Sequence, residues 1–267
     1  MVNRYWYILK GGGKVEEKLI LEEIKKHIKS EMNILVLDSV NSTNNLAKEL
    51  LLKGEKTPFL VAANNQTNGR GRQGKSFFSK ENGGIYMTLA IGPDIQNYSL
   101  VTAKTAVATA QALRSLKNLP FLIKWVNDIY LSDKKVCGIL CEAVREPATN
   151  LLKGIIIGIG VNTNIENFPK EISSVAASIN ICEGEKNLIA AEIINNLYTL
   201  LKSNNRDFLD KYREWSYLAG KSITFCEKGI SYSADVLSID QNGGLVVRLE
   251  NGETKTLMGG EISALLH

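Results

Sequence analysis

Apolar residues recur along this chain at two different spacings, and these spacings predict its secondary structure. A three-to-four-residue period is typical of an amphipathic helix, and short β-rich runs bounded by turn residues are typical of strands. Helices are therefore predicted at residues 16–29, 99–117, 188–202 and 206–215. A further helix is predicted to begin at the cap-forming residues 42–44 and to end at residue 52. Strands are predicted at 33–38, 59–63, 84–91, 122–131, 136–144 and 151–162.

The pattern changes after Ala219-Gly220. From Lys221 onward, short strands alternate with turns such as Asn242-Gly243-Gly244 and Asn251-Gly252, which is the hairpin pattern of a small β barrel. We therefore expect an α+β fold in three parts. These are an N-terminal extension with a helix (1–32), a mixed-sheet domain (33–218) and a small C-terminal barrel (219–267).

Composition narrows the class of protein without identifying it. The chain has 267 residues, of which 44% are hydrophobic and 22% charged, as in ordinary globular proteins. Lys and Arg number 32 and Asp and Glu 28, so the net charge is +4, too small and too dispersed to indicate nucleic-acid binding. The sequence contains neither a membrane-spanning apolar run nor a signal-peptide pattern, and a cytoplasmic location is expected.

Cysteine and histidine are too scarce for several kinds of site. The four cysteines form no C-x-x-C pair and the chain has only two histidines, so zinc sites and histidine-based catalytic triads are disfavoured. Cys137 and Cys141 fall on one face of a predicted strand, and we interpret them as buried, reduced thiols.

The segment GRGRQGKS, residues 69–76, fits the P-loop pattern G-x-x-x-x-G-K-[ST]. That motif requires a helix directly after the loop, but FFSKENGG follows here and its Asn-Gly-Gly turn leaves no room for one. We therefore interpret the segment as a different anion-binding loop, in which Arg70, Arg72 and Lys75 are carried on flexible glycines.

Polar clusters interrupt segments that would otherwise be apolar scaffolding. Ser42-Thr43-Asn44 could simply cap a helix, Lys135 could be a solvated hairpin lysine, and GIGVN (158–162) could be an ordinary strand end. The run KWVND, residues 124–128, is harder to explain in this way, because burying its charges unpaired would cost several kcal/mol. That run requires partners or a ligand.

Together these clusters resemble the biotin-protein ligases. The motifs GRGRQGKSF, KWVNDIY, KKVCGILCE and GIGVNTN occur in the order and at about the spacing of that family, and the final barrel resembles its SH3-like domain. Val126 departs from the family pattern, which usually has proline in KWPND. The resemblance implies that ATP and biotin react to form biotinyl-5'-adenylate, and that a lysine of a biotin carrier domain, as in acetyl-CoA carboxylase, then takes the biotin.

The resemblance also implies roles for individual residues. Catalytic roles fall on Lys135, Arg72 and Asp128, with Asp128 facing either the acceptor lysine or Mg²⁺. The implied biotin-binding residues are Ser42, Thr43, Asn44, Gln66, Arg70, Gly71, Arg72 and Lys135. The implied ATP- and adenylate-binding residues are Arg70, Arg72, Lys75, Asn127 and Asn162, and Asn127 is also a candidate Mg²⁺ ligand because magnesium prefers oxygen.

Three alternatives remain open at this point. A lipoate-protein ligase would share the fold and the adenylation chemistry, but the arginine-glycine loop and KWVNDIY favour the biotin type. A biotin-sensing repressor would need a helix-turn-helix module of about 60 residues, and only 32 precede the first predicted strand, so no DNA binding is expected. A non-enzymatic binding module would not need the cations at Arg72 and Lys135. No membrane partner is expected, and a homodimer is compatible with the sequence.

Overall fold

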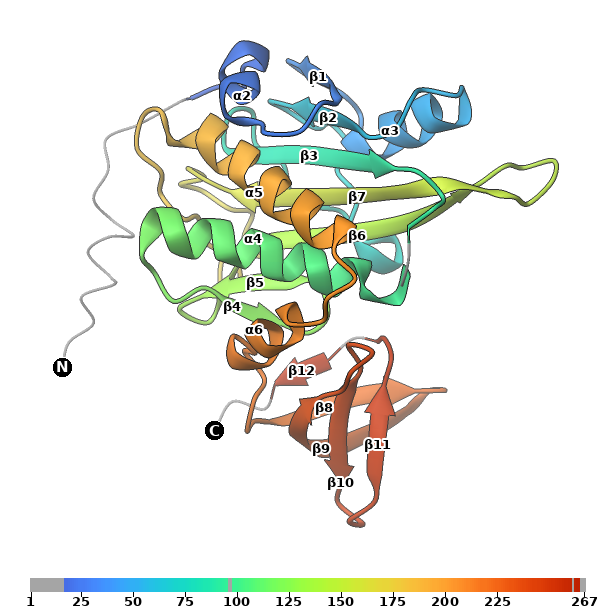
Figure 1. Ribbon diagram of the computed structural model, residues 1–267. Coiled ribbons are helices and arrows are strands. Elements are labelled where there is room, and N and C mark those ends of the chain that lie inside the picture. Colours follow the sequence, from blue (N-terminus) through green and yellow to red (C-terminus); the bar gives the residue numbers. More distant parts are fainter. Residues whose placement is uncertain (1–16, 96–97, 261, 265–267) are drawn as a thin grey trace.

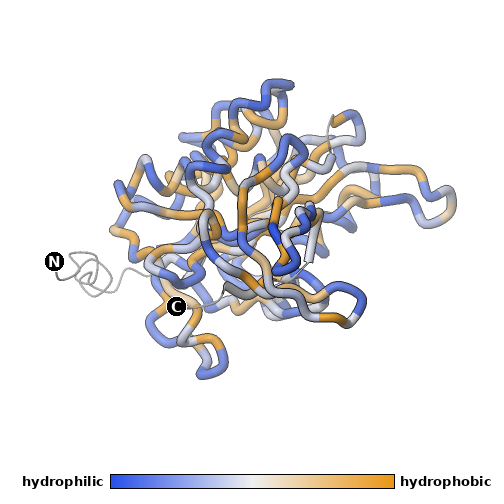
Figure 2. The backbone as a smooth tube through the Cα atoms, turned by 90° about the horizontal axis from the view of Figure 1, so that it is seen from below, coloured by the Kyte–Doolittle hydropathy of each residue, from blue (hydrophilic) through white to orange (hydrophobic). Residues whose placement is uncertain are grey.

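The computed structural model describes residues 17–95, 98–260 and 262–264, so the first half of the predicted extension, residues 1–16, lies outside the described part. Figure 1 shows a larger body in which helices pack on a central sheet, and a smaller β body beside one end of it. No helix among the described residues is long and apolar enough to cross a bilayer. Hydrophobic segments run through the interior, and many hydrophilic ones lie in peripheral loops (Figure 2).

The central sheet has seven strands in the order β1-β2-β3-β7-β6-β5-β4. Only β1 and β2 are parallel and the remaining neighbours are antiparallel, which confirms the predicted mixed sheet. The strands are β1 (Asn33–Leu37), β2 (Phe59–Ala63), β3 (Gly84–Ile91), β4 (Leu122–Lys124), β5 (Asp128–Leu131), β6 (Lys134–Arg145) and β7 (Leu152–Asn162).

Helices cover both faces of this sheet. On one face α4 (Val101–Lys117) and α5 (Glu185–Lys202) pack over residues such as Ile157 and Ile159, which belong to the main core. On the other face α3 (Thr43–Leu52) packs over Ile156 through Ala47 and Leu51. Because side chains alternate along a strand, Gly158 and Gly160 of β7 point to the same face as Ile156, that of α3.

Two predicted elements differ in the structure. The predicted strand 122–131 is two strands, β4 and β5, because residues 125–127 form a turn between them; the Trp125–Val126 peptide bond in that turn is cis. The predicted helix 16–29 is reduced to α2 (Leu21–His27). Its expected first turn is extended instead, because the Leu19 and Ile20 N–H groups donate to the side-chain oxygens of Asn64 and Asn187.

A buried lysine completes the attachment of this extended segment. Lys186 of α5 is fully buried, and its Nζ donates to the carbonyl oxygens of Glu17 and Asn82. Burial lowers the pKa of Lys186 to about 8, an effect that the nearby Glu17 partly offsets.

The smaller body is an antiparallel five-stranded sheet in the order β11-β10-β9-β8-β12. Its strands are β8 (Ser222–Glu227), β9 (Ile230–Ile239), β10 (Leu245–Leu249), β11 (Thr254–Leu257) and β12 (Ile262–Ala264). The short helix α6 (Phe208–Glu214) precedes it, and Arg213 Nε donates to the Ile239 carbonyl. The Trp125 indole N–H also donates to the carbonyl of Gly243, at 2.8 Å, so the β4–β5 turn contacts the barrel directly.

Candidate functional site

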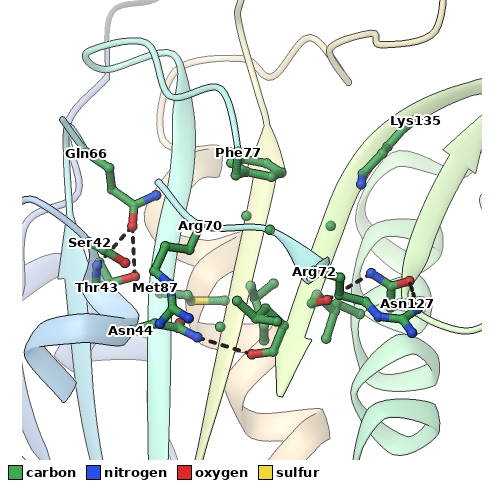
Figure 3. Close-up of a pocket in the computed structure, with 17 residues that line it drawn as sticks. Ser42, Thr43, Asn44, Gln66, Arg70, Arg72, Phe77, Met87, Asn127 and Lys135 are labelled. Carbon is green, nitrogen blue, oxygen red and sulfur yellow. Dashed lines mark hydrogen bonds between the residues drawn. The ribbon is translucent and has the colours of Figure 1, made fainter. Parts of the chain in front are cut away.

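A pocket opens on the α3 face of the central sheet, between α3, strands β6 and β7, and the glycine-rich loop (Figure 3). Its cavity volume is about 50 Å³. Nine residues selected from the sequence line it, although they come from distant parts of the chain: Ser42, Thr43, Asn44, Gln66, Arg70, Gly71, Arg72, Asn127 and Lys135.

Glycines in the two central strands make room for this pocket. A Cβ atom on Gly158 would lie 2.1 Å from Asn44 Oδ1, and one on Gly160 would lie 2.6 Å from the ring of Phe77. Gly138 of β6 pairs with Gly160 of β7, so the two glycines are neighbours in the sheet. The GIGVN motif is therefore more than a strand end, since side chains at these positions would displace the pocket walls.

Side-chain amides and hydroxyls form one end of the pocket. Gln66 Oε1 accepts from the backbone N–H of Thr43 at 2.9 Å and lies 3.2 Å from its hydroxyl. The Thr88 hydroxyl contacts Asn44 Oδ1 at 2.7 Å. Ser42 occupies the N-cap position of α3, but its hydroxyl makes no cap hydrogen bond, and the side chain is 1% exposed. A capping role therefore does not account for Ser42.

The glycine-rich loop forms a narrow hairpin over the pocket instead of a P-loop. Phe77 N–H donates to the carbonyl of Gly69, Gly71 N–H donates to that of Lys75, and a single 3-10 turn lies at Arg72–Gly74. No helix follows within residues 75–83, all of which are described, so the P-loop interpretation is excluded as predicted.

The two loop arginines point to different partners. Arg70 binds the carboxylate of Glu142 through both terminal nitrogens, at 2.9 and 3.2 Å. Arg72 Nη1 donates to Asn127 Oδ1 at 3.0 Å, while Asn127 Nδ2 donates to the Ile139 carbonyl at the same distance (Figure 3). Arg72 is therefore placed toward the KWVND turn, and Arg70 toward strand β6.

A second cavity, with a volume of about 320 Å³, adjoins the first one. Arg72, Asn127 and Lys135 line both cavities. The second cavity adds Lys75 from the loop and three residues of KWVND, namely Lys124, Trp125 and Asp128. It also reaches the barrel at Gly260 and Ile262. A ligand with an apolar end and an anionic end could therefore extend from one cavity into the other.

Lys135 and Asp128 face each other where the cavities meet. Lys135 Nζ lies 2.8 Å from Asp128 Oδ1, and both side chains are mostly buried. Lys124 has a lowered pKa because it is desolvated, and Asp128 partly counteracts this effect. The polar run KWVND thus has its partners in the fold, and Asp128 pairs with Lys135.

The structure also tests how well the residues fit a magnesium ion. Asp128 offers a carboxylate at the second cavity, which is the hard oxygen ligand that Mg²⁺ prefers. The Asn127 oxygen, the predicted ligand, already accepts from Arg72. Within the described part of the chain, no three acidic, histidine or cysteine side chains cluster into a metal site. Both residues already have a cationic partner, Arg72 for Asn127 and Lys135 for Asp128, and Asp128 is the one that carries a carboxylate.

Asn162 is the predicted site residue that the fold does not bring to either cavity. It lies at the end of β7, is 5% exposed, and donates from Nδ2 to the carbonyl of Ala177. Three neighbours of the pocket had no assigned role. Phe77 and Glu142 end the motifs GRGRQGKSF and KKVCGILCE, which is a usable signal, whereas Thr88 stands in an apolar strand without any local signal.

Comparisons with known proteins agree with one another. The sequence model described as the Biotin/lipoate A/B protein ligase family matches residues 36–162, and that of the Biotin protein ligase C terminal domain matches residues 219–265. The bifunctional ligase/repressor BirA of Bacillus spizizenii is 30% identical over 260 residues, which cover 93% of this chain and 79% of that protein. The biotin--[acetyl-CoA-carboxylase] ligase of Mycobacterium tuberculosis is 23% identical, covering 85% and 88%.

Among solved structures, the biotin protein ligase from Aquifex aeolicus in complex with biotin and ATP resembles this chain with a TM-score of 0.74. The two are 26% identical, and the match covers 87% of this chain and 98% of that one.

Proposed function

Because the chain belongs to the biotin protein ligase family, we propose that it attaches biotin to a lysine of a biotin carrier domain, using ATP and the intermediate biotinyl-5'-adenylate. The observation that carries the proposal is the pair of joined cavities, one with a glycine floor and a polar end, the other rich in cations. In this proposal biotin occupies the first cavity and the nucleotide the second.

In the first step, an oxygen of the biotin carboxylate attacks the α-phosphorus of ATP, and the bond to the leaving pyrophosphate breaks. Both reactants are anionic and repel each other. Lys135 and Arg72 line both cavities, so their charges lie where the carboxylate meets the phosphate. Lys75 lines only the second cavity and would bind nucleotide phosphate there.

In the second step, the acceptor lysine nitrogen attacks the acyl carbon, AMP leaves, and the amine loses a proton. A lysine amine with an ordinary pKa near 10.4 is neutral in roughly one molecule in 2,500 at pH 7. Asp128 is the carboxylate at the junction of the cavities, and it would take that proton or orient the amine.

Magnesium, when bound, would neutralise charge on the triphosphate, and its protein ligand would be Asn127, or Asp128 if that carboxylate does not act on the acceptor lysine. The decisive experiment is titration calorimetry of biotin with and without ATP, followed by mass spectrometry of the bound product. We expect biotin to bind and biotinyl-adenylate to accumulate without a carrier. Absence of biotin binding, or of any biotinyl-adenylate, contradicts the proposal.

Several finer statements belong to the same proposal. The acceptor would be the carrier domain of a biotin-dependent carboxylase such as acetyl-CoA carboxylase, as the names of the relatives suggest. The domains would be 1–32, 33–218 and 219–267, and the protein would act in the cytoplasm, where ATP is available. The edge strand β1 offers a surface for a homodimer, which sedimentation analysis would detect.

We also propose that the chain does not bind operator DNA, although some of its relatives are described as ligase/repressors. Its net charge is only +4, and the described residues before β1 contain a single seven-residue helix, α2. Sequence-selective retention of a DNA fragment in a gel-shift assay at physiological salt would show the opposite.

A further inference from the structure

Arg70 and Glu142 form an ion pair that lies beside the pocket and outside the reaction scheme described above. The carboxylate of Glu142 binds both terminal nitrogens of Arg70, and Asn45 Oδ1 accepts a further bond from Arg70 at 3.1 Å. The side chains are 38% and 27% exposed, so water screens the pair only in part. Such forked, charge-assisted contacts fix geometry as well as adding stability.

Arg70 stands at the base of the loop hairpin. It forms an isolated antiparallel bridge with Ser76, and the 3-10 turn that carries Arg72 begins two residues further on. Gly69 precedes it in a position without space for a side chain, since a Cβ there would lie 2.5 Å from the carbonyl oxygen of Phe77. Whatever holds Arg70 therefore holds the root of the hairpin against the sheet.

Glu142 has a second partner inside the pocket. Its Oε2 accepts from Asn44 Nδ2 at 2.9 Å, and Asn44 in turn contacts Thr88. One carboxylate of β6 thus orients an amide at the polar end of the pocket and also anchors the loop above it. The two arginines of the loop differ accordingly: Arg70 is neutralised by Glu142, whereas Arg72 contacts an uncharged amide and lines both cavities.

We infer that Glu142 is a positioning residue that, through Arg70 and Asn44, anchors the glycine-rich loop over bound biotin and its adenylate. The inference rests on the proposed function, because it concerns retention of that intermediate. It assigns Arg70 to the anchor and leaves Arg72 and Lys75 to face the anionic ligand. Losing the anchor loosens the loop without removing any group at the reacting atoms.

The test compares the wild type with Glu142→Gln, Arg70→Gln and the double variant. Glu49→Gln is the matched control, because Glu49 is exposed on α3 and pairs there with Lys53. Three quantities are measured: the KM for biotin, the rate at which bound biotinyl-adenylate is released without a carrier, and the transfer rate from chemically made adenylate at saturation.

We expect Glu142→Gln to raise the KM and the release rate roughly three- to tenfold, as for losing a partly exposed charge-assisted pair. The transfer rate should stay within about twofold of the wild type, because the loop contributes to retention and not to this step. The double variant should be no worse than the more affected single variant, since both substitutions remove the same anchor.

The inference is overturned if Glu142→Gln has the same KM for biotin and the same adenylate release rate as Glu49→Gln. It is also overturned if the double variant shows the product of the two single-variant effects. An equal loss in all three quantities indicates general damage and also counts against it. If the wild type forms no biotinyl-adenylate, the proposed function itself fails. If the wild type forms it and the variants retain it equally well, only this inference fails.

Discussion

Adding one methyl group to the floor of the pocket should selectively weaken biotin binding. In Gly158→Ala, the new Cβ would lie 2.1 Å from Asn44 Oδ1, at least 0.9 Å closer than atoms tolerate. Gly158 is in the middle of β7 and is not among the glycines with positive φ, so alanine suits its backbone. The strand can therefore stay in place, and the side chain of Asn44 must move.

The magnitude follows from the bonds that Asn44 makes. Its Oδ1 contacts the Thr88 hydroxyl at 2.7 Å and its Nδ2 donates to Glu142 at 2.9 Å. A displacement of this size stretches at least one of these contacts beyond hydrogen-bonding range. Leaving a buried polar group without its partner costs about 1–3 kcal/mol, which corresponds to a loss of biotin affinity of roughly 5- to 150-fold.

Calorimetric titration with biotin measures the affinity, and thermal unfolding shows whether the fold is retained. Gly259→Ala is a matched control, because no atom lies within 4 Å of the added Cβ. In an Asn44→Ala background the clash is gone, and Gly158→Ala should then change the affinity by less than about twofold. The reasoning is refuted if Gly158→Ala binds biotin like the wild type, or if its cost persists in that background.

Three further outcomes are expected. Arg72→Ala should release biotinyl-adenylate roughly tenfold to a hundredfold faster in a filter-retention time course, because a charge-assisted contact is lost; wild-type retention would contradict this. With chemically made adenylate, Lys135→Ala should regain most of its transfer rate to a carrier domain, whereas Asp128→Asn should not; rescue of both variants would place Asp128 in adenylation. Lys186 releases its proton near pH 8 in the folded protein but near 10.4 when unfolded, so the unfolded state binds more protons between those values. The unfolding free energy should therefore rise by about 3 kcal/mol across that window relative to Lys186→Met, as measured by urea titration, and parallel pH profiles would refute the assignment.

Elements with strong local patterns could be predicted from the sequence. Strands β2 and β3 begin and end where the apolar runs do, at Phe59–Ala63 and Gly84–Ile91. The predicted helix 16–29 was too long. The N–H groups of residues 19 and 20 donate to the side chains of Asn64 and Asn187, which are distant in sequence, and a local helix propensity does not include such contacts. The run 122–131 has strand propensity throughout, and only contacts with other segments reveal the turn at 125–127.

The residues of the candidate site could be predicted from motifs, but the partners of their side chains could not. Motif order gathered residues such as Thr43, Gln66 and Lys135, which do line one pocket. A spacing along the chain does not show which partner a charged side chain will have. Asp128 pairs with Lys135 although Lys124 is its cross-strand neighbour, and Arg70 of the loop pairs with Glu142 of β6, so both pairings depend on how distant segments pack together. The motif predicted that Asn162 binds nucleotide. In the structure its side chain donates to the carbonyl of Ala177, and the role in nucleotide binding stays a prediction.

The contact between Trp125 and the barrel limits how freely the two bodies can be exchanged. The indole N–H of Trp125 ends on the Gly243 carbonyl, and Gly260 and Ile262 complete a wall of the second cavity. A chimera that joins this catalytic sheet to a relative's barrel would thus carry a hybrid nucleotide cavity. Its apparent KM for ATP should depend on the origin of the barrel even though every proposed catalytic residue lies outside the barrel. The barrel and the KWVND turn should therefore be exchanged as one unit.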